Sequence, residues 1–77
     1  MAAATISNAI LSDAHAKEMS KIAKEEVSAH LYEDGDLFLF GSELACLRIA
    51  YANRHKETKV AYSDNLQTFY VAIYSGQ

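Results

Sequence analysis

The stretch from Thr68 to Tyr74 constrains the fold most strongly, because its side chains alternate at the period of a β-strand. One face of this strand is entirely apolar, and the opposite face carries two tyrosines. The first face comprises Phe69, Val71 and Ile73, and the second comprises Thr68, Tyr70, Ala72 and Tyr74. We expect the apolar face to pack against helices and the tyrosine face to meet solvent or a partner.

A helix is predicted from Asp13 to Leu31, because apolar residues recur there at steps of three and four. Thr5, Ser7 and Ser12 are alternative N-caps for it. The predicted apolar stripe consists of Leu11, His15, Met19, Ile22, Ala23, Val27, His30 and Leu31.

A strand and a second helix are predicted after an acidic turn at Glu33–Asp36. Leu37–Phe40 is apolar on both faces, which is typical of a buried strand. Glu43–Arg54 follows as a helix with Ser42 as its N-cap. This helix is apolar around most of its circumference, so we expect the first helix and the sheet, or a second subunit, to cover two of its sides.

The predicted element order is αβαββ, with Lys59–Ser63 forming a hairpin with the final strand. A right-handed crossover makes the Leu37 and Lys59 strands parallel. We expect the final strand to lie between them and antiparallel to both, as in a split βαβ arrangement. The 77 residues are therefore predicted to form one two-layer α+β domain, with two helices on one face of a three-stranded mixed sheet.

This arrangement leaves the tyrosine face of the sheet uncovered. A chain of this length buries only about 60% of its unfolded surface, and 51% of its residues are hydrophobic. Uncovered apolar patches usually mark interfaces, so we expect the domain to bind another protein or to form a homodimer through the second helix or the sheet. The predicted partner-binding residues are Tyr32, Glu33, Asp34, Asp36, Tyr62, Tyr70 and Tyr74.

The acidic residues indicate the charge of such a partner. The segment from Glu25 to Glu43 holds six acids and no Lys or Arg, which favours a protein with a basic surface. A solvated turn is the simpler interpretation of Glu33–Asp36. This segment lacks the ligand series of an EF-hand calcium loop.

An alternative function is nucleic-acid binding through a basic cluster near the end of the second helix. The candidate contacts are Arg48, Arg54, Lys56 and Lys59. The net charge of −3 argues against this alternative, because nucleic-acid-binding domains usually carry a basic excess.

No catalytic residue, metal site or cofactor is predicted, because the chain has no motif for any of them. His15, His30 and His55 are too scattered to share a metal ion, and Cys46 is expected to be a buried apolar side chain. The start of the chain has no basic signal-peptide region, and no apolar run approaches the roughly 20 residues that span a membrane. With one cysteine, the chain is expected to be cytoplasmic.

In length, acidity and single-domain format, the chain resembles the small inhibitor proteins encoded by phages and mobile elements, including anti-CRISPR proteins. No motif carries this resemblance, so it assigns no residue a role. It implies a non-enzymatic inhibitor or adaptor that acts on a larger complex.

Overall fold

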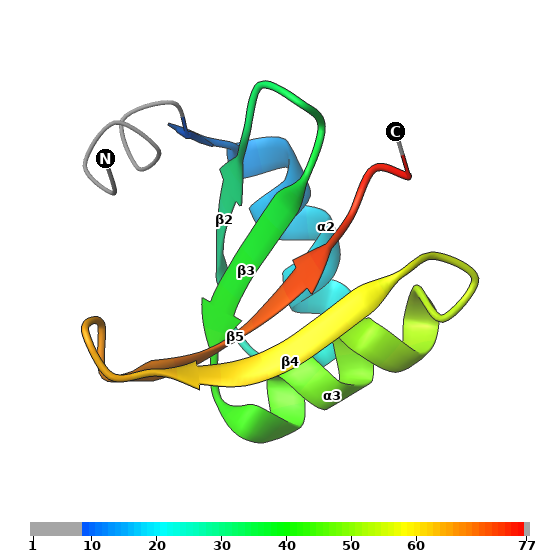
Figure 1. Ribbon diagram of the computed structural model, residues 1–77. Helices are drawn as coiled ribbons and strands as arrows, with labels where there is room; N and C mark the ends of the chain where they lie inside the picture. Colours follow the sequence, from blue (N-terminus) through cyan, green and yellow to red (C-terminus); the bar gives the residue numbers. More distant parts are fainter. Residues whose placement is uncertain (1–8, 77) are drawn as a thin grey trace.

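The computed structural model describes residues 9–76, in which two helices pack on one face of a five-stranded sheet (Figure 1). The strand order is β1-β2-β3-β5-β4, and every neighbouring pair is antiparallel. The α+β class and the two helices are as predicted, but the prediction of a three-stranded mixed sheet was wrong. The elements are β1 (Ile10–Leu11), α2 (Asp13–Ala23), β2 (Ser28–Leu31), β3 (Leu37–Gly41), α3 (Glu43–Ala52), β4 (Thr58–Ser63) and β5 (Thr68–Ile73).

The first described helix begins as predicted but ends eight residues early. Ser12 is its N-cap and accepts a hydrogen bond from the His15 N–H, whereas Thr5 and Ser7 lie outside the described residues. Lys24 ends α2 in the left-handed conformation, with φ of 62°, and its N–H donates to the Ser20 carbonyl oxygen. The Val27 N–H then donates to Ser20 Oγ at 3.0 Å, which turns the chain back toward the sheet.

The residues after this turn form β2 instead of a helical extension. Ala29 is buried against the helices, whereas His30 lies on the opposite side of the strand. β2 pairs with β3 on one side and with the short edge strand β1 on the other. These two strands account for the difference between the predicted and observed sheets.

The other half of the sheet follows the predicted topology. β5 lies between β3 and β4 and is antiparallel to both, so β3 and β4 run in the same direction. Val71 in β5 is paired with Leu39 in β3 and with Val60 in β4. The crossover between β3 and β4 is α3, whose N-cap Ser42 accepts a hydrogen bond from the Ala45 N–H at 3.1 Å.

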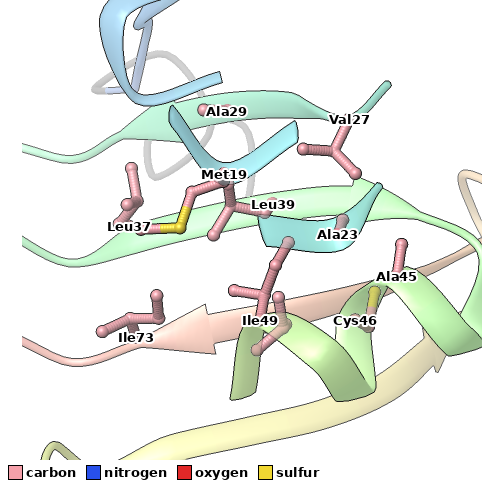
Figure 2. Close-up of a cluster of buried hydrophobic side chains, with 11 residues drawn as sticks. Met19, Ala23, Val27, Ala29, Leu37, Leu39, Ala45, Cys46, Ile49 and Ile73 are labelled. Atoms are coloured by element: carbon pink, nitrogen blue, oxygen red, sulfur yellow. The ribbon is translucent and has the colours of Figure 1, made fainter. Parts of the chain in front are cut away.

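The hydrophobic core lies between the two helices and the inner face of the sheet (Figure 2). Met19 and Ala23 of α2 and Ile49 of α3 are buried there, together with Leu39 and Val71 of the sheet. Within residues 9–76 both helices lie on this side, so the opposite face, hereafter the outer face, is left without a helical cover (Figure 1).

Candidate functional site

The outer face carries five aromatic rings in contact with one another. Strand pairing places Phe38 beside His30, and Phe40 beside Tyr70. The ring centroids of His30 and Phe40 are 5.0 Å apart, those of Phe40 and Tyr70 are 6.1 Å apart, and those of Phe38 and Tyr70 are 5.7 Å apart. Tyr32 completes the group, with its ring 5.1 Å from that of Phe38. We call these five side chains the ring cluster.

The ring cluster is neither buried nor fully exposed. Each ring keeps part of its surface accessible, while Ala72 on the same face is completely buried among its neighbours. The rings therefore form a broad apolar surface in which solvent still reaches each member. This is the mixture of packing and exposure expected of a preformed contact surface.

A cavity of about 330 Å³ lies beside the ring cluster. One wall is formed by His30, Tyr32 and Phe40, and another by the β4–β5 turn, where Leu66 is 61% exposed. Nδ1 of His30 is buried and has no hydrogen-bond partner among residues 9–76. The cavity thus combines mostly apolar walls with the polar residues Ser63 and Asn65 of the turn, and such a lining is usual in a site that receives a side chain or a small group.

The acidic turn lies at one end of the outer face, and two of its carboxylates accept hydrogen bonds from the backbone. Asp34 accepts a hydrogen bond from the Asp36 N–H at 3.0 Å, and Asp36 accepts one from the Ser75 N–H at 2.9 Å. Both side chains line a second cavity of about 410 Å³ with Glu57 and Tyr74. Their carboxylates therefore stabilise the turn and also contribute negative charge to this end of the face.

The predicted partner-binding residues do not all share one surface. Tyr32 and Tyr70 belong to the ring cluster, and Tyr74 lies with the acidic turn. Glu33 is exposed in that turn. Tyr62 is on the inner side of edge strand β4, where its ring packs 5.0 Å from that of Phe69 and it remains 50% exposed.

Sequence reasoning missed His30 and Leu66 as parts of this site. The sequence pattern places His30 on a helical stripe, and only the alternation of Ala29 and Leu31 with Ser28 and His30 indicates a strand there. Leu66 has no periodic signal, because it lies in the turn between two strands.

The basic residues of the alternative function are distributed over different parts of the fold. Nη1 of Arg48 donates a hydrogen bond to the Ala23 carbonyl oxygen at 2.9 Å. The guanidinium of Arg54 lies 4.2 Å from the centre of the Tyr51 ring. Lys56 is in the loop after α3, and Lys59 lies on the outer face beside the acidic cavity. The four side chains therefore do not form one basic surface.

Cys46 is a core side chain, as predicted, and is only 1% exposed. Burial raises the pKa of its thiol, the charge of Glu25 raises it further, and a backbone hydrogen bond from Gly41 partly opposes both. A raised pKa suppresses the thiolate, which is the nucleophilic form. Within residues 9–76, no group of three or more His, Cys, Asp or Glu side chains is placed to hold a metal ion.

Neither α2 nor α3, the helices of the described region, is long and apolar enough to cross a membrane. Comparison of the chain with protein-family models, with curated proteins and with solved structures finds no match.

Proposed function

We propose that this domain is a non-enzymatic protein-binding module, a small inhibitor or adaptor that contacts a larger complex through its outer face. The observation that carries the proposal is the ring cluster, which stands on a sheet face that neither described helix covers. Aromatic side chains provide large contact area and lose little conformational entropy on binding.

The cavity beside the ring cluster supplies an anchoring position. An apolar side chain of the partner would fill the space between Phe40 and Leu66 and bury surface that both now expose. A polar group on the same partner segment would meet Ser63 and Asn65, which line the cavity from the β4–β5 turn. The cavity thus favours a partner segment with a large side chain that is mostly apolar.

The acidic turn determines the charge of the preferred partner. Glu33, Asp34 and Asp36 border the outer face, and the chain carries a net charge of −3. Such an acidic rim accelerates association with a basic surface, and this attraction weakens as the salt concentration is raised. We therefore expect the partner to present Lys or Arg side chains around its apolar anchor.

Site-specific photocrosslinking tests this proposal. A photoreactive phenylalanine derivative replaces Leu66 in one variant and Tyr51 on α3 in the other, and both positions are well exposed. After irradiation in the cells that naturally produce the protein, position 66 should give a crosslinked product with another protein. When a lysate is irradiated instead, the yield of this product should fall as salt is added. Position 51 should not yield that product.

A second measurement separates binding from folding. Leu66→Arg places a charge in an exposed turn and should leave the thermal unfolding temperature nearly unchanged. The variant should no longer capture the partner protein that the wild type captures. Capture that is equal with wild type and Leu66→Arg, or an equal yield from positions 66 and 51 of the product with the other protein, would exclude the outer face as the binding surface.

A further inference from the structure

Helix α3 exposes a second apolar surface on the side that faces away from the sheet. Leu44 is 53% exposed, Leu47 is 50% exposed and Tyr51 is 68% exposed. Their spacing of three and four residues is that of a seam between two packed helices. Ala45, Cys46 and Ile49 on the inner side are buried, so α2 and the sheet cover only one side of α3. We call Leu44, Leu47 and Tyr51 the α3 stripe.

A shallow groove of about 450 Å³ runs beside the α3 stripe, between α2 and α3. Ile22 lies on one side of this groove, and Leu47 and Tyr51 lie on the other. Arg48 also lines it, but its guanidinium is bound to the Ala23 carbonyl oxygen. An apolar side chain from a facing helix therefore has a place to insert next to the stripe.

The two ends of α3 carry opposite charge. Glu43 lies in the first turn, and Glu25 is held nearby through a 2.6 Å hydrogen bond from Ser42 Oγ. Arg54, His55 and Lys56 follow the last turn. A second helix with this same distribution attracts α3 when the two are antiparallel and repels it when they are parallel.

We propose that the α3 stripe is a homodimer interface in which α3 packs antiparallel to α3 of a second copy around a two-fold axis near Leu47. In this register Leu47 meets its own symmetry mate, and Leu44 of each copy meets Tyr51 of the other. Glu43 of each copy then approaches Arg54 of the other, so the charges at both ends of the interface are complementary.

This dimer leaves the outer face of each copy free, because α3 and the outer face lie on opposite sides of the sheet (Figure 1). The inference therefore stands independently of the proposed function. A ten-residue helix is only about 15 Å long. We expect a small interface with a dissociation constant on the order of 100 μM.

Sedimentation velocity and light scattering on the full chain, from about 1 μM to about 1 mM, test the dimer over the range expected for a small interface. The wild-type mass should rise from that of the monomer to that of the dimer. Leu47→Arg should remain monomeric throughout. Leu66→Arg is the matched control, because it makes the same change at a similarly exposed leucine and should still dimerise.

A charge exchange tests the antiparallel register. Glu43→Arg and Arg54→Glu should each weaken dimerisation at least tenfold, because each places like charges at both ends of the interface, and the double variant should recover most of the loss. Thermal unfolding would verify that each variant is folded. A wild-type chain that is monomeric at every concentration, or a dimer that survives Leu47→Arg, would overturn the proposal. A dimer that is lost in Leu47→Arg but unaffected by the charge changes would overturn the antiparallel pairing.

Discussion

Arg48 of α3 closes the C-terminal end of α2, because its Nη1 donates a hydrogen bond to the carbonyl oxygen of Ala23 at 2.9 Å. That carbonyl belongs to the last turn of α2, where the helix lacks N–H partners and its dipole favours a cation. The contact joins residues 25 positions apart and links the two helices that cover the core. Arg48 is therefore a structural residue, although the sequence placed it in a candidate nucleic-acid cluster.

Arg48→Met should lower the free energy of unfolding by about 1–3 kcal/mol, the usual loss when a charged donor leaves a partly buried acceptor. Arg54→Met is the matched control, since Arg54 makes an exposed hydrogen bond and an exposed ring contact with Tyr51. The loss of unfolding free energy in Arg54→Met should stay below about 1 kcal/mol. Urea unfolding at one low protein concentration measures both, and equal losses would contradict the assigned role of Arg48.

Lys24 is the reason that sequence periodicity overestimated the length of the first helix. A left-handed C-cap is usually glycine, but here it is lysine at φ of 62°, so no residue type marks the helix end. The apolar spacing that continues through Val27 and Leu31 fits a helix and, equally, a turn followed by a strand. The hydrogen bonds from the Glu25 N–H to the Ser20 carbonyl oxygen and from the Val27 N–H to Ser20 Oγ decide between the two, because a continuing α-helix would make neither.

Lys24→Gly should therefore raise the free energy of unfolding by about 0.5–1 kcal/mol, because glycine adopts this conformation without the steric cost that lysine has. Lys17→Gly, at an exposed position inside the same helix, should lower it by about 1 kcal/mol. Chemical denaturation of both variants gives the comparison. A loss of stability in Lys24→Gly similar to that in Lys17→Gly would show that this helix end has no strain to relieve.

Gly41 at the end of β3 leaves room for Val27. A Cβ atom at position 41 would lie 2.9 Å from Cγ1 of Val27, which is itself buried against the core. Gly41→Ala should therefore lower the free energy of unfolding by about 1–3 kcal/mol, the range for overpacked sites. In a double-mutant cycle with Val27→Ala, the combined loss should be smaller than the sum of the single losses. Strictly additive losses would mean that the destabilisation by Gly41→Ala does not come from a clash with Val27.

The parts of the fold that could be predicted are those where the residue pattern is compatible with only one secondary structure. The alternation in β5 and the β3–α3–β4 crossover predicted that β5 lies between β3 and β4, that it is antiparallel to both, and which of its faces bears Tyr70. The ring cluster was only partly predictable, because His30 enters it through β2. The α3 stripe was visible as an apolar helix, but which of its sides the sheet covers depends on tertiary packing.

Cys46 makes the stability of the domain depend on pH in the alkaline range. Its folded pKa is raised above the ordinary value of 9.0, chiefly by burial and secondarily by the charge of Glu25. Above pH 9 the unfolded chain therefore releases the thiol proton before the folded chain does, so the folded state binds more protons. Stability from this group is fully present below the unfolded pKa and is lost as the pH rises toward the raised folded pKa.

Cys46→Ala removes this titration and leaves a small cavity in the core. The variant should be less stable than wild type near pH 7, and the difference should narrow as the pH rises from about 9 to about 10.5, by at most about 1.4 kcal/mol per pH unit. Urea unfolding of both proteins across this range measures the difference, in which the tyrosines and lysines that both proteins share largely cancel. A difference that stays constant with pH would mean that the thiol ionises equally in the folded and unfolded chains, and that Cys46 is not shielded by the core.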